Sequence, residues 1–542
     1  MYIKNQLIPL EQLENMEGCR QNTLSLPFSS MHLIQMDSVQ RWMDDLRLMA
    51  ECECMCILQS KPISVDGDGL NELVITSQQN LQDSLQTLLK RAWTITTELS
   101  NIFYKLEKNR WQWIHCTAVR LNCHVRSLIS EYNSYTRNAS VEIQQFETIL
   151  IEKCCHLTTI TESCMHDEDE ATVSSVKTEI VDTLTSFSQS FSQMVELALT
   201  HEIQDLVMQL DSATSIYNIE IAVSSLISLT QEGAHLCHII AKEGGVAVLF
   251  KLCRQDAPSY LHVHALRALT SICSVEEGIN ELEKVGGVLC LADLLTNERN
   301  SEATRAEAAA VVSQITSPHV FTQHLSSFLE NMEDIVTALI NLCKDASSSE
   351  VFLLASAALA NITFFDSMAC EILLQLNATK ILIEACHDLR RVDTPYSKDQ
   401  VVTILANMAI LEPCASEMIQ ENGIELLLEF LHEKISPGIS AEGAALERVL
   451  QKSAVTLARL SRQPDITNIA TSLNCIPRLI ELCRFPSERN NSDSVLVACL
   501  AALRRLAASC PQSFEESDYQ QLIKPRLVDS FLLCSNMEES FV

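Results

Sequence analysis

Apolar residues recur every three to four positions over most of the chain after residue 80, which is the period of an amphipathic helix. Three stripes follow one another, from Leu81 to Leu106, from Trp113 through Val119 to Ile129, and from Ile143 to Leu157. The chain holds only 12 Gly and 13 Pro, too few for the many turns of an all-β protein. These patterns predict an amphipathic helical bundle over residues 81–200.

A longer pattern repeats over residues 201–533. Each unit joins an apolar helix, a polar turn, a short helix, a Gly or Asn, and another apolar helix. The breaks fall 42, 91, 45 and 52 residues apart, at Gly244, Gly286, Asn377, Asn422 and Asn474. The gap of 91 divides into two if residues 328–343 mark a less regular unit. This period is typical of armadillo and HEAT repeats, and a residue that adopts φ > 0 before the third helix favours armadillo.

We therefore expect an all-α fold: an armadillo-like helical-repeat solenoid, preceded by the bundle and by a largely disordered N-terminal segment. In armadillo families such as importin-α and β-catenin, an Asn on the third helix hydrogen-bonds the backbone of a bound peptide. Asn361 in "ALANIT" and Asn407 in "ILANMA" match that position. A cap or a bond between helices explains both Asn residues equally well. Arg267, Arg459 and Arg505 would make the groove locally basic and suited to an acidic peptide.

Residues 1–80 are mostly polar and irregular, with one strong signal at about 36–64. A helical stripe there is followed by acidic Glu51 and Glu53, which alternate with cysteines in the period of an extended strand. The stripe consists of Val39, Trp42, Met43, Leu46 and Met49. Because Trp and Met are enriched in interfaces, we interpret this segment as a ligand for a concave helical partner. The alternative is that its helix packs on the chain's own bundle.

The net charge of the 542 residues is −31, with 70 acidic and 39 basic side chains. A field of this sign repels phosphate backbones, so we expect no nucleic-acid partner. No uninterrupted apolar run is long enough to span a bilayer, so we expect no direct membrane insertion and a cytoplasmic protein. The 22 cysteines are scattered and stand mostly at apolar helical positions, as expected for buried reduced thiols.

The sequence shows no catalytic signature. It contains no phosphate-binding loop, nucleophile elbow or zinc-protease motif, and Cys52, Cys54 and Cys56 lack a second ligand pair at zinc spacing. We therefore expect a protein that is not an enzyme and that has no cofactor or metal.

Residues 534–542, "CSNMEESFV", form a tail after the last expected helix. A PDZ domain adds an extended C-terminal peptide to a sheet edge and buries the last side chain. Ser540 and Val542 fit such a site, with Phe541 pointing outward or touching its rim. The tail is therefore predicted to bind a PDZ domain.

Three long strings resemble the vertebrate Inscuteable family: "DSVQRWMDDLRLMAECECMCILQSKPIS", "ASAALANITFFDSMACE" and "RLVDSFLLCSNMEESFV". The resemblance implies an adaptor that orients the spindle in asymmetric cell division. Its N-terminal segment would bind the TPR repeats of a Pins/LGN-type protein, and through it Gα and the spindle-pulling machinery. The PDZ domain would belong to a scaffold of the Par polarity complex at the apical cell cortex. The alternative function is an armadillo-type receptor for linear peptides in transport or adhesion.

Overall fold

The computed structural model describes residues 79–108, 110–135, 141–164, 170–318, 326–434, 440–463, 466–509 and 511–535. Every regular element in these ranges is a helix, so the all-α prediction is confirmed. The helices divide into two compact units, one ending at Gly245 and the other beginning at Val246. No helix among those described combines the length and the hydropathy needed to cross a membrane.

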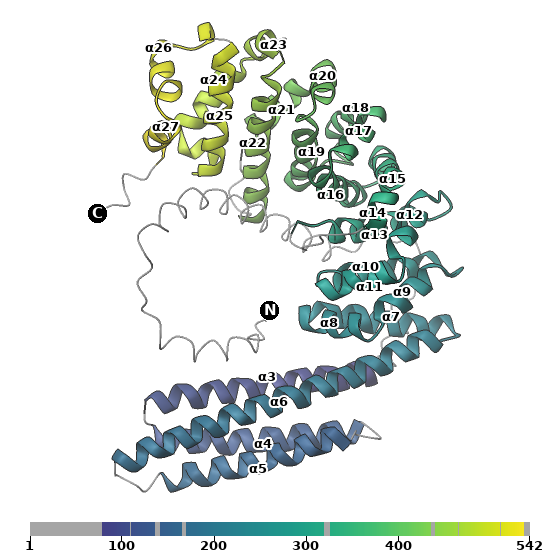
Figure 1. The fold of residues 1–542 in the computed structure, drawn as a ribbon, viewed down its shortest axis with the longest axis vertical. Coiled ribbons are helices and arrows are strands. Elements are labelled where there is room, and N and C mark those ends of the chain that lie inside the picture. Colours follow the sequence, from purple (N-terminus) through teal and green to yellow (C-terminus); the bar gives the residue numbers. More distant parts are fainter. Residues whose placement is uncertain are drawn as a thin grey trace. The chain divides into compact units, whose positions relative to one another are not determined.

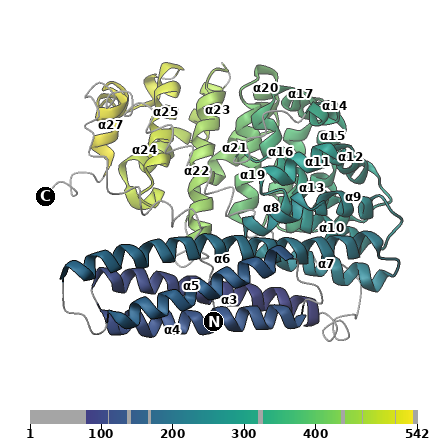
Figure 2. The ribbon, with the colours of Figure 1, turned by 60° about the horizontal axis from the view of Figure 1, so that its bottom comes forward.

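The first unit contains a bundle of four long helices: α3 (Gln79–Glu107), α4 (Trp111–Tyr135), α5 (Val141–Ser163) and α6 (Glu170–Ser212) (Figures 1 and 2). Each helix packs on two others, in the order α3, α4, α5, α6 and back to α3. Buried residues repeat at alternating steps of three and four along each helix, which keeps one apolar face turned inward. In α3 these are Ile95, Leu99, Ile102 and Leu106.

Two details of the predicted bundle are wrong. Trp113 and Val119 do not belong to the buried stripe of α4, since their relative exposures are 62% and 41%. Apolar residues flank the true stripe on both sides, and the pattern alone does not show which of them face the core. The stripe that is buried consists of Ile114, Ala118, Leu121, Val125 and Leu128.

The second wrong detail is the end of the bundle, which we expected at residue 200. The helix α6 instead continues to Ser212, because buried Leu199, Ile203, Leu206 and Leu210 extend its apolar face. Two shorter helices complete this unit, α7 (Ile216–Gln231) and α8 (Ala234–Lys242), and both contact α6.

The second unit is a stack of helical repeats. Its long third helices are α10 (Ser259–Ile272), α13 (Glu302–Ile315), α16 (Ser349–Phe365), α19 (Pro395–Met408), α22 (Ser440–Leu460) and α25 (Asp493–Ser509). Each packs on the next one along the chain. Figure 1 places α13, α16, α19 and α22 on the inner side of this curved stack.

The shorter helices of the repeats precede the third helices, α9 singly within this unit and the others in pairs. They are α9 (Gly245–Cys253), α11 (Glu276–Lys284), α12 (Gly287–Thr296), α14 (Ser326–Glu330), α15 (Met332–Asp345), α17 (Ser367–Gln375), α18 (Ala378–Cys386), α20 (Glu412–Gln420), α21 (Gly423–His432), α23 (Ile466–Ser472) and α24 (Cys475–Arg484). In Figure 1, α15, α17, α18 and α20 lie on the outer side of the stack. Short helices in pairs before one long helix make the stack armadillo-like, as predicted.

The predicted breaks between the short helices have left-handed backbone conformations. The φ angles are +86° at Gly244, +65° at Gly286, +53° at Asn377, +63° at Asn422 and +57° at Asn474. Glycine adopts this conformation without strain, and asparagine tolerates it better than most residues. The intervening unit is less regular, as expected: Asn331 between α14 and α15 has φ −108°.

The segment η2 (Pro486–Arg489) joins α24 to α25. The last repeat is covered by η3 (Pro511–Ser513), α26 (Glu516–Asp518), η4 (Tyr519–Ile523) and α27 (Leu527–Cys534). Arg504 on α25 donates hydrogen bonds to the Ile523 carbonyl at 3.0 Å and to Ser530 Oγ at 2.9 Å. These bonds tie the closing segment to the third helix beneath it.

Candidate partner-binding surface

Two of the three predicted binding segments lie outside the described residues. The first comprises Val39, Trp42, Met43, Leu46, Met49, Glu51 and Glu53, and the second comprises Ser540, Phe541 and Val542. The third, on the third helices of the repeats, is described in full.

Asn361, Asn407, Arg459 and Arg505 occupy the same position on four consecutive third helices, α16, α19, α22 and α25, and we call them the third-helix row. Each side chain donates a hydrogen bond to the backbone of the preceding third helix. Asn361 Nδ2 reaches the Ser313 carbonyl at 2.9 Å, and Asn407 Nδ2 reaches the Ala360 carbonyl at 3.4 Å. Arg505 Nη1 reaches the Ala458 carbonyl at 3.1 Å, and Arg459 Nη1 donates to the Ala406 carbonyl.

The acceptor carbonyls, like the donors, occupy equivalent positions on consecutive third helices. Each carbonyl belongs to the residue just before the corresponding position of the preceding repeat, so the bonds form one ladder along the stack. The structure thus gives both asparagines the bond between helices that we kept as an alternative to peptide binding. An amide nitrogen carries two N–H groups and a guanidinium carries five. Asn407 Nδ2 also donates to Thr363 Oγ1 at 3.2 Å, so its two N–H groups are both used, whereas the ladder takes only part of the donors of Asn361 and the two arginines.

Arg267 does not contribute free charge to a basic groove, contrary to expectation. Its Nε lies 2.6 Å from Glu307 Oε1 on the next third helix, and the Glu307 side chain is only 7% exposed. Burial raises the pKa of the Glu307 carboxyl, and the charge of Arg267 opposes that rise. The pair therefore neutralises itself inside the stack.

A second buried charge cluster was missed by the sequence analysis. Asp399 on α19 lies 2.7 Å from Arg448 Nε and 2.7 Å from Lys452 Nζ, both on α22. Burial raises the pKa of the Asp399 carboxyl, but the charges and hydrogen bonds of Lys452 and Arg448 outweigh it, so the pKa lies below its usual value. The available signal was an aspartate just before the apolar run of α19, together with two cations four residues apart on α22.

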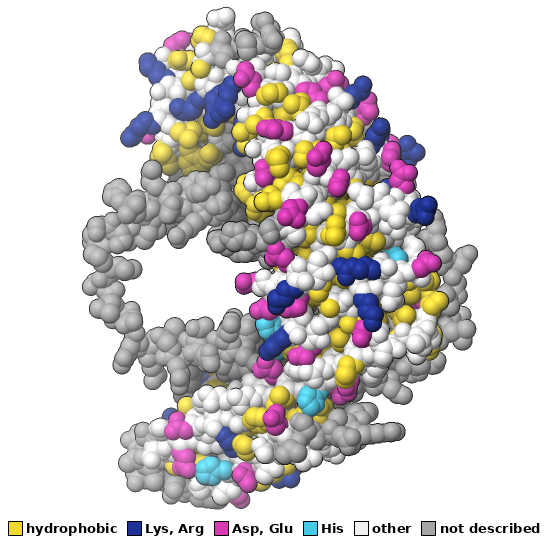
Figure 3. Space-filling model, turned by 45° about the vertical axis from the view of Figure 1, so that its right-hand side comes forward, with side chains coloured by type: hydrophobic (Ala, Val, Ile, Leu, Met, Phe, Trp, Pro, Cys, Tyr) yellow, Lys and Arg dark blue, Asp and Glu magenta, His cyan; other side chains and the backbone are white. Residues whose placement is uncertain are grey.

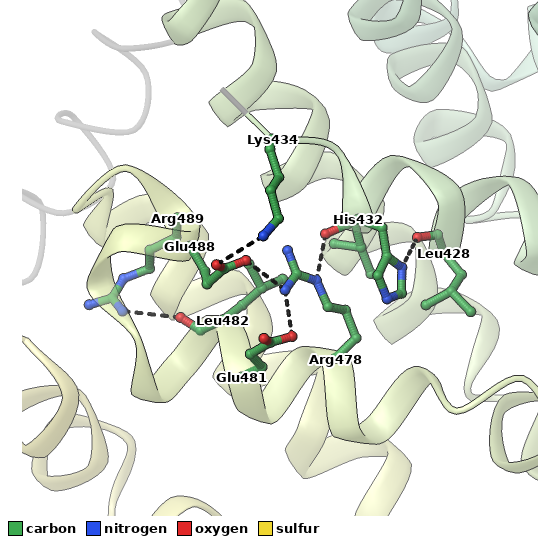
Figure 4. A network of polar contacts seen from close by, with 9 residues as sticks. Leu428, His432, Lys434, Arg478, Glu481, Leu482, Glu488 and Arg489 are labelled. Atoms are coloured by element: carbon green, nitrogen blue, oxygen red, sulfur yellow. Dashed lines mark hydrogen bonds and ion pairs between the residues drawn. The ribbon is translucent and has the colours of Figure 1, made fainter. Parts of the chain in front are cut away.

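Figure 4 shows a third such network near the end of the solenoid. The Arg478 side chain is 4% exposed and contacts Glu481 at 2.5 Å and Glu488 at 2.9 Å. Its Nε donates to the Leu431 carbonyl at 2.8 Å, and Lys434 approaches Glu488 from the preceding repeat at 3.5 Å. All three networks join neighbouring repeats, which identifies their role as holding the stack together.

Potential metal ligands and thiols occur within the described residues. Within these ranges, no group of three or more His, Cys, Asp or Glu side chains is arranged to hold a metal ion. Seventeen cysteines are described, all free, and thirteen of them are buried. Burial raises the pKa of the Cys414 thiol to about 11 and that of Cys475 to about 11, so neither is a reactive thiolate at neutral pH.

Several solved structures with helical repeats are similar to this chain. An engineered protein aligns with a TM-score of 0.47 at 18% identity, covering 76% of this chain and 98% of its own. A designed armadillo repeat protein aligns with a TM-score of 0.37 at 21% identity, covering 46% of this chain and 99% of its own.

Comparisons of sequence are more specific. Residues 91–542 match the family model described as Protein inscuteable C-terminal, and residues 34–80 match the one described as Inscuteable LGN-binding domain. Protein inscuteable homolog of Homo sapiens is 60% identical over 526 residues, which cover 97% of this chain and 91% of that protein. The homolog of Mus musculus shows the same identity and coverage. The chain belongs to the Inscuteable family.

Proposed function

We propose that this protein is a non-enzymatic adaptor that binds an LGN-type TPR protein and thereby helps to orient the mitotic spindle. The observation that carries the proposal is the match of residues 34–80 to the Inscuteable LGN-binding domain. Identity of 60% to the human and mouse homologs over nearly the whole chain supports the same role.

The chemistry of the segment fits a concave helical partner. Val39, Trp42, Met43, Leu46 and Met49 recur at helical spacing, so in a helix they share one face. Burial of that face in the partner's groove would supply most of the affinity, with Trp42 as the largest anchor. The carboxylates of Glu51 and Glu53 would then meet basic side chains along the TPR repeats.

The finer parts of the proposal concern the other partners. Through the TPR protein the adaptor would reach Gα and the spindle-pulling machinery, and through a PDZ domain of a Par scaffold it would reach the apical cortex. Ser540, Phe541 and Val542 are the residues that we assign to the PDZ domain. In this arrangement the repeats serve as a stable body between two linear motifs.

The proposal is tested by titrating an LGN-type TPR domain into the full chain and into a variant that lacks residues 34–80. We expect saturable binding by the full chain and none by the deletion variant. Far-UV circular dichroism serves as the control, because α4 to α27 lie outside the deletion and their helical signal should persist. Equal affinity of the two proteins would place the binding site elsewhere and contradict the assignment.

A further inference from the structure

Three arginines lie together on the last two repeats: Arg459 on α22, Arg462 just after α22, and Arg505 on α25. We call them the arginine cluster. Arg462 and Arg505 are exposed, and Arg459 is half-buried. Burial lowers the pKa of the Arg459 guanidinium, and the charges of Arg505 and Arg462 lower it further. The geometry agrees for one pair, since Arg505 Nη1 lies 3.1 Å from the carbonyl of Ala458, the residue next to Arg459. Arg459 therefore lies among like charges.

Several cations on the third helices have acidic partners, whereas none is found for the arginine cluster among the described residues. Arg267 pairs with Glu307, and Arg448 and Lys452 pair with Asp399. Across the described ranges, no carboxylate lies within ion-pair distance of a guanidinium of the cluster. The hydrogen bonds described for Arg459 and Arg505 go to the backbone carbonyls of Ala406 and Ala458. An external anion would relieve the repulsion that the protein leaves uncompensated.

This uncompensated positive charge stands out in a chain whose net charge is −31. On the face seen in Figure 3, acidic and basic side chains are interspersed over the repeats, with one group of Lys and Arg side chains at the upper end. Local charge of the opposite sign to the whole molecule attracts a ligand to one place rather than to the surface in general.

The third-helix row extends the cluster in one direction. Asn407 and Asn361 place amide donors on the two preceding third helices, α19 and α16. Packed helices lie roughly 8–10 Å apart, so the four positions of the row span roughly 30 Å. An extended peptide of about nine residues covers that length. Such a peptide would place a backbone carbonyl at the amide of Asn361, which makes one bond within the stack, and carboxylates at the guanidiniums.

We propose that the arginine cluster and the third-helix row bind an extended acidic segment of a partner protein. The carboxylates lie against Arg459, Arg462 and Arg505, and the chain runs toward Asn407 and Asn361. This site is distinct from residues 34–80, so its test does not involve the TPR protein.

The test measures fluorescence anisotropy of labelled octaglutamate titrated with the full chain, with octaglutamine and octalysine as comparison peptides. We expect saturable binding of octaglutamate alone, and weaker binding as the salt concentration rises, because exposed charges are screened. The variant Arg462→Gln/Arg505→Gln should bind octaglutamate roughly tenfold more weakly, since each exposed charge pair contributes modestly. Both side chains are exposed, so this variant should fold normally, which circular dichroism checks.

Arg299 is the matched control. It is an exposed arginine in the turn after α12, and the substitution Arg299→Gln removes one charge without touching the row. We expect Arg299→Gln to bind octaglutamate like the natural protein. The proposal is overturned if octaglutamate does not bind saturably, or if Arg299→Gln weakens binding as much as the double variant. It is also overturned if octathymidylate binds more tightly than octaglutamate, because the site would then suit nucleic acid.

Discussion

Arg489 is the largest fully buried side chain among the described residues, with 1% relative exposure. Its Nη1 donates to the carbonyls of Leu482 at 3.0 Å and Cys483 at 3.1 Å, and its Nη2 donates to the carbonyl of Cys534 at 2.8 Å. The last of these bonds holds the end of α27 against the helices of the last repeat. Burial lowers the pKa of the guanidinium. Arg489 thus secures the end of the closing helix α27, alongside the bond from Arg504 to Ser530.

We predict that Arg489→Met loosens α27. The substitution leaves buried carbonyls without donors, and each such loss costs roughly 1–3 kcal/mol. Hydrogen exchange of the amides of residues 527–535 should become faster, and the thermal unfolding temperature should fall. Arg390→Met is the matched control, because the Arg390 side chain is 85% exposed. Unchanged exchange in α27 would show that Arg489 is not its anchor.

A second prediction at this scale concerns the PDZ-binding tail. Val542→Asp should abolish binding of a Par-type PDZ domain, because a charge replaces the side chain that fills the apolar pocket. Binding of the TPR domain should stay the same, since residues 34–80 are unaltered. The measurement is a titration of each domain into the variant. Retained PDZ affinity would remove Val542 from the proposed motif.

At the scale of elements, the breaks between short helices show how much the sequence predicts. Gly244, Gly286, Asn377, Asn422 and Asn474 were identified from the repeat alone, and all five have positive φ. The prediction of these positions succeeded because few residue types other than Gly and Asn tolerate the left-handed conformation. The residue type at each break is therefore a local signal in the sequence. The end of α6 was missed because its apolar face continues past residue 200 without a break.

Asn422 provides a test of this local requirement. Asn422→Ala should lower the free energy of unfolding by about 1 kcal/mol. The Cβ of alanine disfavours a φ of +63°, and alanine lacks the polar side chain that lets asparagine tolerate this conformation. Asn422→Gly should be neutral or slightly stabilising, and it is the matched control. Urea unfolding monitored by circular dichroism gives the comparison. Equal stability of the Ala and Gly variants would contradict the role of the left-handed conformation.

Contacts between elements were harder to predict. The row asparagines donate to carbonyls 47 and 48 residues away, in the preceding repeat. Every residue has a carbonyl, so nothing in the sequence distinguishes such an acceptor. The side-chain partners of Asp399 lie 49 and 53 residues further along the chain, and only the packing of α19 on α22 shows that they meet.

The Asp399 cluster makes stability depend on pH. We predict that Asp399→Asn lowers the stability of the solenoid at pH 7 by roughly 3–5 kcal/mol, because Arg448 and Lys452 lose their buried partner. The folded pKa is lowered, so the stabilisation by Asp399 is present above its unfolded pKa of about 3.9 and is lost as the pH falls through the lower folded value. The difference between the natural protein and the variant should therefore shrink below about pH 4.

Thermal unfolding at several pH values measures this difference. Asp388→Asn is the matched control, because Asp388 pairs with Arg390 and Arg391 at the surface and its substitution should have a much smaller effect. An equally large effect of both substitutions would show that burial of the Asp399 cluster is not the cause.

At the scale of the whole molecule, the fold class and the family were predictable, whereas the use of the groove was not. The helical period of the apolar residues and the strings that resemble the Inscuteable family are spread over hundreds of residues. Local errors at Trp113 or at the end of α6 therefore do not alter the predicted fold class or family. The charge of the groove depends on which arginines are paired inside the stack. Arg267 is neutralised by Glu307, and the arginine cluster is not, which only the packing of the third helices shows.

The central claim is that the N-terminal helical stripe binds an LGN-type TPR protein. Its most direct test is isothermal titration of the TPR domain into the full chain and into two tryptophan variants, Trp42→Ala and Trp113→Ala. Trp113 is the matched control because it is 62% exposed on the bundle. A tryptophan anchor contributes about 2 kcal/mol or more, so Trp42→Ala should bind at least tenfold more weakly, while Trp113→Ala should bind like the natural protein. The account is contradicted if the natural protein shows no saturable binding or if Trp42→Ala binds as tightly as Trp113→Ala.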